Sequence, residues 1–306
     1  MTTTHSIRTA DRDGAGGAGP LRVVLRFAGT ILSNGKARIG AAILGLFVVV
    51  GVFAPLLAPY DPTANDFASG EGATAAHWLG TTAAGEDVLS QLLHGAQVSL
   101  LVGFVAGGLS TVVAVLIGLS WGYLRGFVAD AINFVVNLFL VIPGLPLMIV
   151  LAAYLQGGGL IMIIAVVVVT GWAWGARVLR SQTQSLRSRD FVTAAVFSGE
   201  SSTRIVFREI LPNMLSLIVS SFFGAATAAI LAESGLSYLG LGDTSTISWG
   251  TMLFWAQNSN ALLTGQWALL FAPGLCIALL ATSLTLINFG VDGISNPRLR
   301  EGKGQR

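Results

Sequence analysis

The sequence has very few charged residues. Of its 306 residues only 10% are charged and 53% are hydrophobic, and the mean hydropathy is +0.74. So few charges cannot cover the surface of a soluble globule, and much of the surface must therefore face lipid. The composition predicts a membrane protein.

Cysteine and histidine are also scarce. The single cysteine, Cys276, lies in an apolar run, so no intrachain disulfide and no cysteine metal cluster is possible, and we interpret it as a small apolar core residue. The histidines are His5, His77 and His94, and all of them lie outside the apolar segments described below. A serine–histidine hydrolase site within the bilayer is therefore unsupported.

Two sequence motifs that handle metal or nucleotide are absent. The sequence contains no helical pair of metalloprotease histidines and no glycine-rich loop followed by Lys and Ser or Thr. We therefore expect that this chain is not an enzyme, that it binds no metal or cofactor, and that nucleic acid is not among its partners.

Six apolar stretches are long enough to span a membrane. We expect spans at residues 39–57, 98–123, 131–155, 160–176, 215–236 and 267–291. Pro143 and Pro146 predict a kink in the third span. The QGGG sequence at Gln156–Gly159 predicts a tight turn, which would make the third and fourth spans an antiparallel hairpin. The expected fold is an all-α membrane protein with six transmembrane helices.

The basic residues predict how these spans are oriented. All 17 Lys and Arg residues lie in the termini or next to the loops that join spans two to three and four to five, whereas the loops 60–97 and 237–266 contain acids but no Lys or Arg. The positive-inside rule places the basic side in the cytoplasm, with both termini, and the loops 60–97 and 237–266 outside it. Residues 1–37 are then a partly disordered cytoplasmic tail and 38–306 the membrane domain. Residues 21–32 either form a short amphipathic helix on the membrane or simply lead into the first span.

The loop 177–213 is basic and contains several residues that typically begin or end helices. Asp190 suits a helix N-cap, and Gly199 suits the left-handed residue that ends a helix. Ser201 or Ser202 suits the cap of a second helix, and Pro212 either ends that helix or begins the next. The pattern predicts a helix-turn-helix in water between two spans. It is either a docking element for a soluble partner that supplies energy or a loop held at the headgroups by its arginines.

Polar residues are rare within the spans. Glu233 either faces a pore, where it would contact a cationic ligand group, or caps or pairs at the membrane interface. Asn133, Asn137 and Asn288 either line a pore or form hydrogen bonds between helices. Secondary transporters usually carry ionisable groups near the middle of the membrane, and these spans have almost none.

The loop resembles a known signature. DFVTAAVFSGESSTRIVFREILPN is similar to the cytoplasmic loop of ABC importer permeases, in which Glu-Ala-Ala is followed by a glycine and an Ile-x-Leu-Pro-like ending. The triplet falls on Thr193, Ala194 and Ala195, with Thr193 in place of the acid. The glycine falls on Gly199, and the ending on Ile210, Leu211 and Pro212. This resemblance implies that the loop couples the spans to an ATPase subunit.

Other segments resemble the C-type subunit of the oligopeptide and dipeptide branch of these permeases. They are LAPYDP, HWLGTTAAGEDVLSQLLHGAQVSLLVG, LAESGLSYLGLG, SWGTML and NPRLR, spread over residues 57–300. Glu86 and Gln97 stand where the branch commonly has arginines.

The resemblance implies a type I ABC importer permease in a bacterial cell membrane, with dipeptides or oligopeptides as the expected cargo. Its implied partners are a homologous B-type permease, two ATP-binding subunits or a fused ATPase that carry ATP and Mg²⁺, an extracytoplasmic binding protein and membrane lipid. Related permeases carry nickel chelates, glutathione or haem. From another class, a self-sufficient channel or secondary transporter stays open as an alternative.

Overall fold

The computed structural model describes residues 34–155 and 158–295, and this part of the chain is helical. Its β-type pairing is one isolated antiparallel bridge between Thr81 and Asp87. The predicted all-α class is confirmed. The long helices are α2 (Gly35–Leu57), α3 (Val88–Tyr123), α6 (Gly159–Arg187), α9 (Leu215–Tyr238) and α11 (Ala268–Ser295). The shorter ones are α4 (Phe127–Val141), α5 (Gly144–Tyr154), α7 (Asp190–Phe197), α8 (Ser202–Arg204) and α10 (Trp249–Asn258).

Several expectations fall on residues outside the described ranges. They are nearly all of the predicted tail 1–37, the whole of the segment 21–32, Gln156 and Gly157 of the predicted turn, and the NPRLR segment.

Five helices within the described ranges are long and apolar enough to cross a membrane. The predicted third span is instead two helices, α4 and α5, bent by 89° at a short break. The expected kink was therefore too mild. Pro143 forces the preceding Ile142 into extended backbone, with φ −69° and ψ 127°, so α4 must end there. The expectation of six spans holds if the bent pair counts as one span.

Three predicted loops contain more helix than expected. α3 begins at Val88, because Asp87 caps it by accepting a hydrogen bond from Ser90 N–H. α6 continues past Ala176 to Arg187. The apolar-run criterion locates only the part of a helix that faces hydrocarbon, so it missed both extensions. It also missed α10, whose first turn is closed by a reciprocal capping box between Ser248 and Thr251.

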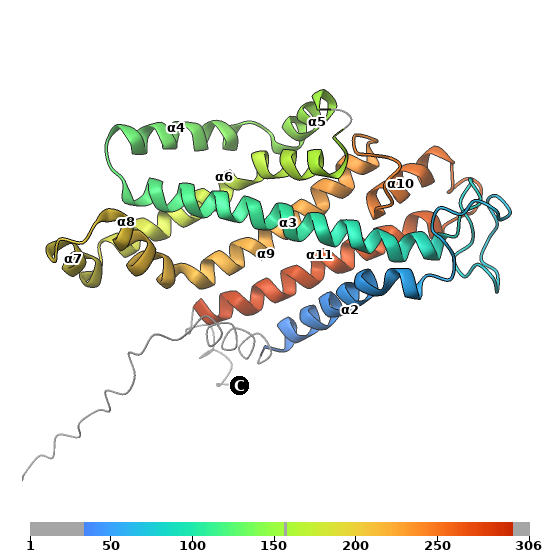
Figure 1. The fold of residues 1–306 in the computed structure, drawn as a ribbon, viewed down its shortest axis with the longest axis horizontal. Helices are drawn as coiled ribbons and strands as arrows, with labels where there is room; N and C mark the ends of the chain where they lie inside the picture. The colour runs from blue at the N-terminus through green and yellow to red at the C-terminus, as the bar shows by residue number, and fades with distance from the viewer. Residues whose placement is uncertain (1–33, 156–157, 296–306) are drawn as a thin grey trace, which may run out of the picture.

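The helix α3 lies at the centre of the bundle and packs against α6 and α9 (Figure 1). Small residues allow this close approach. A Cβ added to Gly107 would lie 2.6 Å from Ala226 Cα on α9, and one added to Gly118 would lie 2.7 Å from Ala176 O on α6. Backbones that approach so closely gain van der Waals contacts that larger side chains would prevent.

A side-chain amide replaces a missing backbone hydrogen bond in the helix α2. Pro55 lies inside α2 and has no N–H, so the carbonyl of Gly51 one turn earlier loses its usual donor. Gln97 Nε2 on α3 donates to that carbonyl at 2.8 Å. Gln97 therefore joins the first two long helices, α2 and α3.

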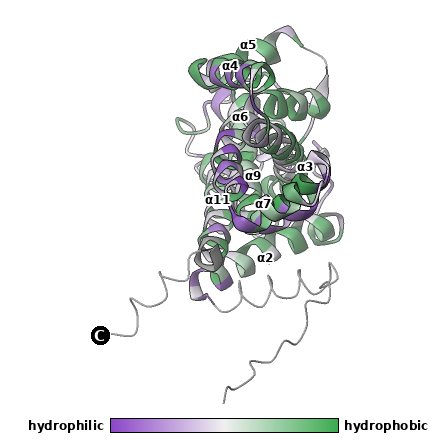
Figure 2. Cartoon of the chain, turned by 90° about the vertical axis from the view of Figure 1, so that its left-hand side faces the viewer, coloured by the Kyte–Doolittle hydropathy of each residue, from purple (hydrophilic) through white to green (hydrophobic). Residues whose placement is uncertain are grey.

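The two ends of the bundle carry different kinds of connection. α7 and α8 lie at one end of the long axis, and α10 with the segment 58–87 lies at the other (Figure 1). Seen from the α7 end, the helices consist largely of hydrophobic residues, with hydrophilic stretches among them (Figure 2). The arginines of the loop 177–213 and the acids of the loops 60–97 and 237–266 are thus at opposite ends of the molecule.

Candidate functional site

The candidate site is the segment that joins α6 to α9, and its first element is the short helix α7. The N-cap is Arg189 and not Asp190 as predicted, because Arg189 has the extended backbone of a cap (φ −81°, ψ 151°). Its carbonyl accepts hydrogen bonds from Val192 N–H at 3.1 Å and Thr193 N–H at 3.0 Å. Asp190 is the first helical residue, where its negative charge interacts favourably with the helix dipole.

The end of α7 follows the prediction. Gly199 has φ +76°, in the left-handed region. Gly199 N–H donates to Val196 O at 3.0 Å, and Glu200 N–H donates to Ala195 O at 3.1 Å. These two bonds form a Schellman motif, which stops the helix at a fixed angle.

A second capped helix begins at once. Ser201 Oγ accepts from Arg204 N–H at 3.4 Å, so Ser201 is the cap of α8. Arg204 Nε lies 3.3 Å from Glu200 Oε1, which forms an ion pair across the turn between an exposed arginine and a half-buried glutamate. The predicted helix-turn-helix is therefore present.

Pro212 lies in the first turn of a new helical element, as one of the two predicted alternatives required. Residues 202–238 form one continuous helical run, in which the π-helix η1 (Ile205–Ile210) and the 3-10 helix η2 (Leu211–Met214) connect α8 to α9. Leu211 N–H bonds to Val206 O in the π pattern, and Asn213 Nδ2 donates to Glu209 O at 2.6 Å. These local changes accommodate the missing N–H of the proline, so the type of helix changes at Pro212 without interrupting the helical run.

Burial divides the segment into an anchor and an exposed face. Val192, Ile205 and Ile210 have at most 1% exposure and pack in a cluster with side chains of α3 and α6. In contrast, Phe197 is 87% exposed and Val196 52%. Such apolar side chains on a short helix beyond the apolar spans are typical of a protein-binding surface.

The predicted triplet lies on this exposed helix. Thr193 and Ala194 are exposed, and Ala195 is half-buried. The Thr193 hydroxyl donates to its own helix at Arg189 O, at a distance of 3.2 Å. Leu211 is half-buried and Pro212 exposed.

Glu233 lies at the other end of α9. It is only 1% exposed, and its carboxylate accepts hydrogen bonds from Ser237 Oγ at 2.9 Å, Ser248 Oγ at 2.8 Å and Ser234 Oγ at 3.3 Å. Within the described ranges no cation contacts it. The structure thus shows Glu233 paired with hydroxyls, and a role in a ligand path stays a prediction.

The three predicted asparagines form hydrogen bonds between helices. Asn288 Oδ1 on α11 accepts from Ser220 Oγ on α9 at 2.6 Å. Asn137 Oδ1 on α4 accepts from Arg177 of α6 at 2.5 Å, and Asn133 Oδ1 accepts from Arg180 at 3.4 Å. The two arginines were expected to set the orientation or to hold the loop at the headgroups, and the sequence carries no signal for their contact with the asparagines, because the partners are 40 and 47 residues apart.

A cavity of about 540 Å³ with a mainly apolar lining lies at the α10 end, between the segment 63–91 and α10. Glu86 lines it, and its Oε2 accepts from Thr82 Oγ1 at 3.0 Å and Gln91 Nε2 at 2.8 Å. In the adjoining turn, hydrogen bonds from the Ser245 side chain and backbone N–H hold the pKa of Asp243 below its ordinary value of 3.8. The cavity therefore combines one acidic side chain, Glu86, with a mainly apolar lining.

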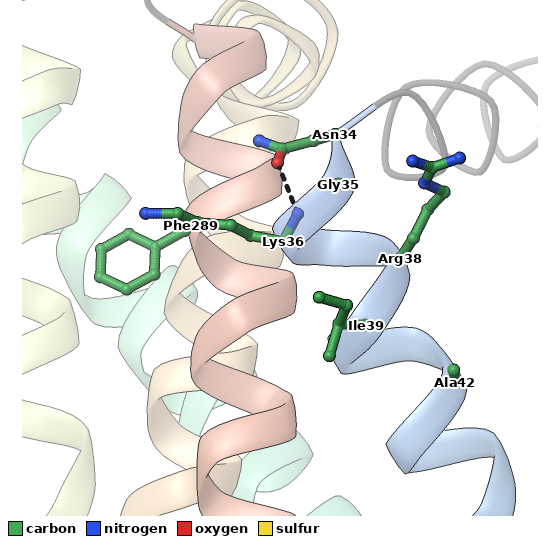
Figure 3. Close-up of a pocket in the computed structure, with 7 residues that line it drawn as sticks. All are labelled: Asn34, Gly35, Lys36, Arg38, Ile39, Ala42 and Phe289. Atoms are coloured by element: carbon green, nitrogen blue, oxygen red, sulfur yellow. Dashed lines mark hydrogen bonds between the residues drawn. The ribbon is translucent and has the colours of Figure 1, made fainter.

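A larger open hollow, of about 780 Å³, lies beside the first turn of α2 (Figure 3). Asn34 Oδ1 accepts from Lys36 N–H at 3.0 Å. The side chains of Lys36 and Arg38 point to different sides of the helix (Figure 3). They do not converge on a common point, so the hollow offers no built site.

Two family models match this chain. One, described as a binding-protein-dependent transport system inner membrane component, matches residues 114–301. The other, described as the N-terminal TM domain of oligopeptide transport permease C, matches residues 27–71.

Similar curated proteins align over most of their length. The oligopeptide transport system permease protein OppC of Mycobacterium tuberculosis (strain H37Rv) is 35% identical over 263 residues, covering 85% of this chain and 89% of the relative. The dipeptide transport system permease protein DppC of Bacillus subtilis is 32% identical over 269 residues, covering 87% and 83%. The di/tripeptide transport system permease protein DppC of Pseudomonas aeruginosa is 31% identical, covering 88% and 90%.

These matches agree with the predicted type I importer permease architecture. The first model covers more than half of the chain, and the relatives share at least 31% of their aligned residues with it. The chain therefore belongs to the family of binding-protein-dependent transport system inner membrane components.

Proposed function

We propose that this protein is the C-type permease subunit of an ATP-driven importer of dipeptides or oligopeptides. Its membership of the permease family, and relatives named as oligopeptide, dipeptide and di/tripeptide permeases, support this cargo class. The observation that carries the proposal is the exposed α7 helix, because it gives a membrane chain without a nucleotide motif a surface for an energy-supplying partner.

The α7 segment is the proposed coupling site. Asp190, Thr193, Ala194, Ala195 and Gly199 form the exposed helix and its stop, and Ile210, Leu211 and Pro212 join it to α9. Phe197 and Val196 supply exposed apolar area for an ATPase subunit. Because a nucleotide shifts a conformational equilibrium only through differential affinity for its states, α7 must make contacts that differ between them.

The remaining partners are proposed from the same family membership. A homologous B-type permease completes the pore, two ATP-binding subunits carry ATP and Mg²⁺, and an extracytoplasmic binding protein delivers the cargo. The segregation of arginines and acids to opposite ends supports an α7 end in the cytoplasm of a bacterial cell. The cavity beside Glu86 then faces the binding protein, and Glu233, Asn133, Asn137 and Asn288 stay proposed positions of the ligand path.

Reconstitution tests the proposal. The chain is placed in proteoliposomes either alone or with its partner subunits and binding protein, and uptake of a labelled dipeptide is measured. We expect uptake only in the complete assembly and only with ATP and Mg²⁺. Flux through the chain alone would instead identify a channel or secondary transporter. ATP-dependent uptake of a nickel chelate, glutathione or haem but not of peptide would support the role as an importer permease and would contradict the proposed peptide cargo.

A further inference from the structure

Two arginines of α6 lie between α4 and α3 without forming an ion pair inside the described ranges. Arg177 Nη2 donates to Asn137 Oδ1 at 2.5 Å, and Arg180 Nη1 reaches Asn133 Oδ1 at 3.4 Å. Arg180 also stacks on Trp121 of α3, with Cζ 3.8 Å from the ring centroid. Three helices thus hold two positive charges in one place.

Neutral groups fix the orientation of this cluster. Asn137 Nδ2 donates to Asn133 O at 2.7 Å and to Asn133 Oδ1 at 2.9 Å. This turns the Asn137 carbonyl oxygen toward Arg177, so the amide cannot flip without losing bonds. The two asparagines position the guanidinium groups but do not neutralise them.

The arginines keep unused hydrogen-bond donors. Each guanidinium has five N–H donors, and the contacts within the described ranges use few of them. Arg180 Nε is buried and has no hydrogen-bond partner there. Asp130 attracts Arg180 only through longer-range electrostatics. Arg177 is exposed, so its remaining N–H donors can reach an acceptor outside the protein, and a group with several oxygens and a negative charge would be favourable here.

The cluster lies at the depth of lipid headgroups. At 1.5 Å per residue, Arg177 is roughly 27 Å along α6 from Gly159, close to the thickness of the hydrocarbon core, and Arg180 is about one turn beyond. Trp174, three residues before Arg177 on the same face, is 68% exposed. Tryptophan is enriched at this boundary, so the face of α6 that carries Arg177 suits the lipid interface.

The surface beside the cluster suits acyl chains. Phe134 and Leu138, which follow the two asparagines on α4, are 69% and 48% exposed. An apolar surface next to paired guanidinium groups matches the two parts of a phospholipid, since guanidinium forms paired hydrogen bonds with phosphate.

We propose that Arg177 and Arg180, oriented by Asn137, Asn133 and Trp121, form a binding site for the phosphate of an anionic phospholipid. This site goes beyond the proposed peptide transport and does not depend on it.

Native mass spectrometry of the purified complex tests the site. The complex is titrated with phosphatidylglycerol and, separately, with phosphatidylcholine, and bound lipid is counted. Two arginines near a membrane surface contribute enough for the double variant R177Q/R180Q to bind phosphatidylglycerol about thirtyfold more weakly. The variant K36Q/R38Q removes the same charge from a pair that does not converge (Figure 3), and we expect it to retain binding.

Two further variants separate a built site from general attraction. R177K/R180K keeps the charge but loses the planar donor geometry, and N133A/N137A keeps both arginines but loses their orientation. We expect an intermediate loss in each, with monodisperse complexes. Inorganic phosphate should not compete at concentrations near that of the lipid, because it lacks the acyl contact.

Several outcomes would overturn the proposal. These are equal losses in R177Q/R180Q and K36Q/R38Q, equal binding of phosphatidylcholine, or competition by inorganic phosphate. Displacement of the lipid by a peptide carboxylate would assign the cluster to the cargo. Loss of another subunit from R177Q/R180Q, with no loss of lipid from the intact complexes, would assign it to a protein contact.

Discussion

Glu233 Oε1 on α9 lies 2.8 Å from Ser248 Oγ, the N-cap of α10, and the carboxylate also accepts from two other serine hydroxyls. A buried acid thereby ties the end of a long helix to the start of a short one. The contact gives Glu233 a structural role that can be separated from transport.

We expect Glu233→Ala to destabilise the protein by several kcal/mol, since it leaves three buried hydroxyls without their acceptor. Glu233→Gln keeps the shape of the side chain and should cost less. The measurements are thermal unfolding and the uptake of cationic and neutral peptides. A selective loss of cationic peptide uptake in Glu233→Gln would support the ligand-path role, and equal effects on both peptides would leave the structural role alone.

Gly199→Ala should uncouple ATP hydrolysis from transport. The positive φ of Gly199 costs an alanine about 1–2 kcal/mol, and no neighbouring atom lies within 4 Å of the added Cβ, so conformation alone is changed. Uptake and stimulation of ATPase activity by the loaded binding protein are measured. Gly224→Ala on α9 is the matched control, since its Cβ also meets nothing within 4 Å and the residue is helical. Normal stimulation in Gly199→Ala would remove the coupling role of this turn.

Phe197→Ser should weaken the attachment of the ATPase subunits at least tenfold, because it removes the most exposed apolar side chain of α7. The stability of the isolated permease should change by less than about 0.5 kcal/mol, as for other surface substitutions. Co-purification of ATPase subunits provides the measurement. Phe127→Ser on α4 alters a side chain of the same 87% exposure, and ATPase capture that falls equally in both variants would contradict a specific interface.

Gln97→Leu should cost about 1–3 kcal/mol, because the carbonyl of Gly51 that Pro55 leaves unbonded would lose its only replacement donor in the described structure. Thermal unfolding in detergent measures the effect. Gln184→Leu, at an exposed position of α6, controls for the loss of a surface amide. A stability equal to that of the control would mean that water satisfies the carbonyl.

Acid should release the turn that begins at Asp243. Its pKa is lowered by hydrogen bonds in the folded state, so the turn is fully stabilised above the ordinary value of 3.8 and loses that stabilisation as the pH falls through the lower folded value. Trp255 Nε1 donates to Thr244 O at 3.2 Å, so tryptophan fluorescence can report the change. We expect a transition below pH 3.8 in the wild type that is absent from Asp243→Asn. The same transition in both would assign it to another group.

Local chemistry accounts for what the sequence predicted well. The left-handed Gly199 and the capping Ser201 depend on a few neighbouring backbone groups, and the spans depend on apolar runs. Both features can therefore be predicted from the sequence alone. Asp190 was displaced by one position, because an extended Arg189 satisfies the first amides through its own carbonyl.

Contacts across long sequence separations were out of reach. The pairing of Asn137 with Arg177 depends on how α4 packs against α6, and the pairing of Gln97 with Gly51 depends on how α3 packs against α2. The break at Pro143 looked like a kink because sequence shows the loss of a hydrogen bond but not the direction in which the chain continues.

The continuous run from Ser202 to Tyr238 has a further consequence for how this chain can vary. One residue inserted into α9 would rotate everything beyond it by about 100°, turning Glu233 away from Ser248 while the α7 end kept its orientation. The continuous helix therefore fixes both the distance between its two ends and their rotation about the helix axis relative to each other. Changes of length should be tolerated in the non-helical segment 58–87, and not between Leu215 and Glu233.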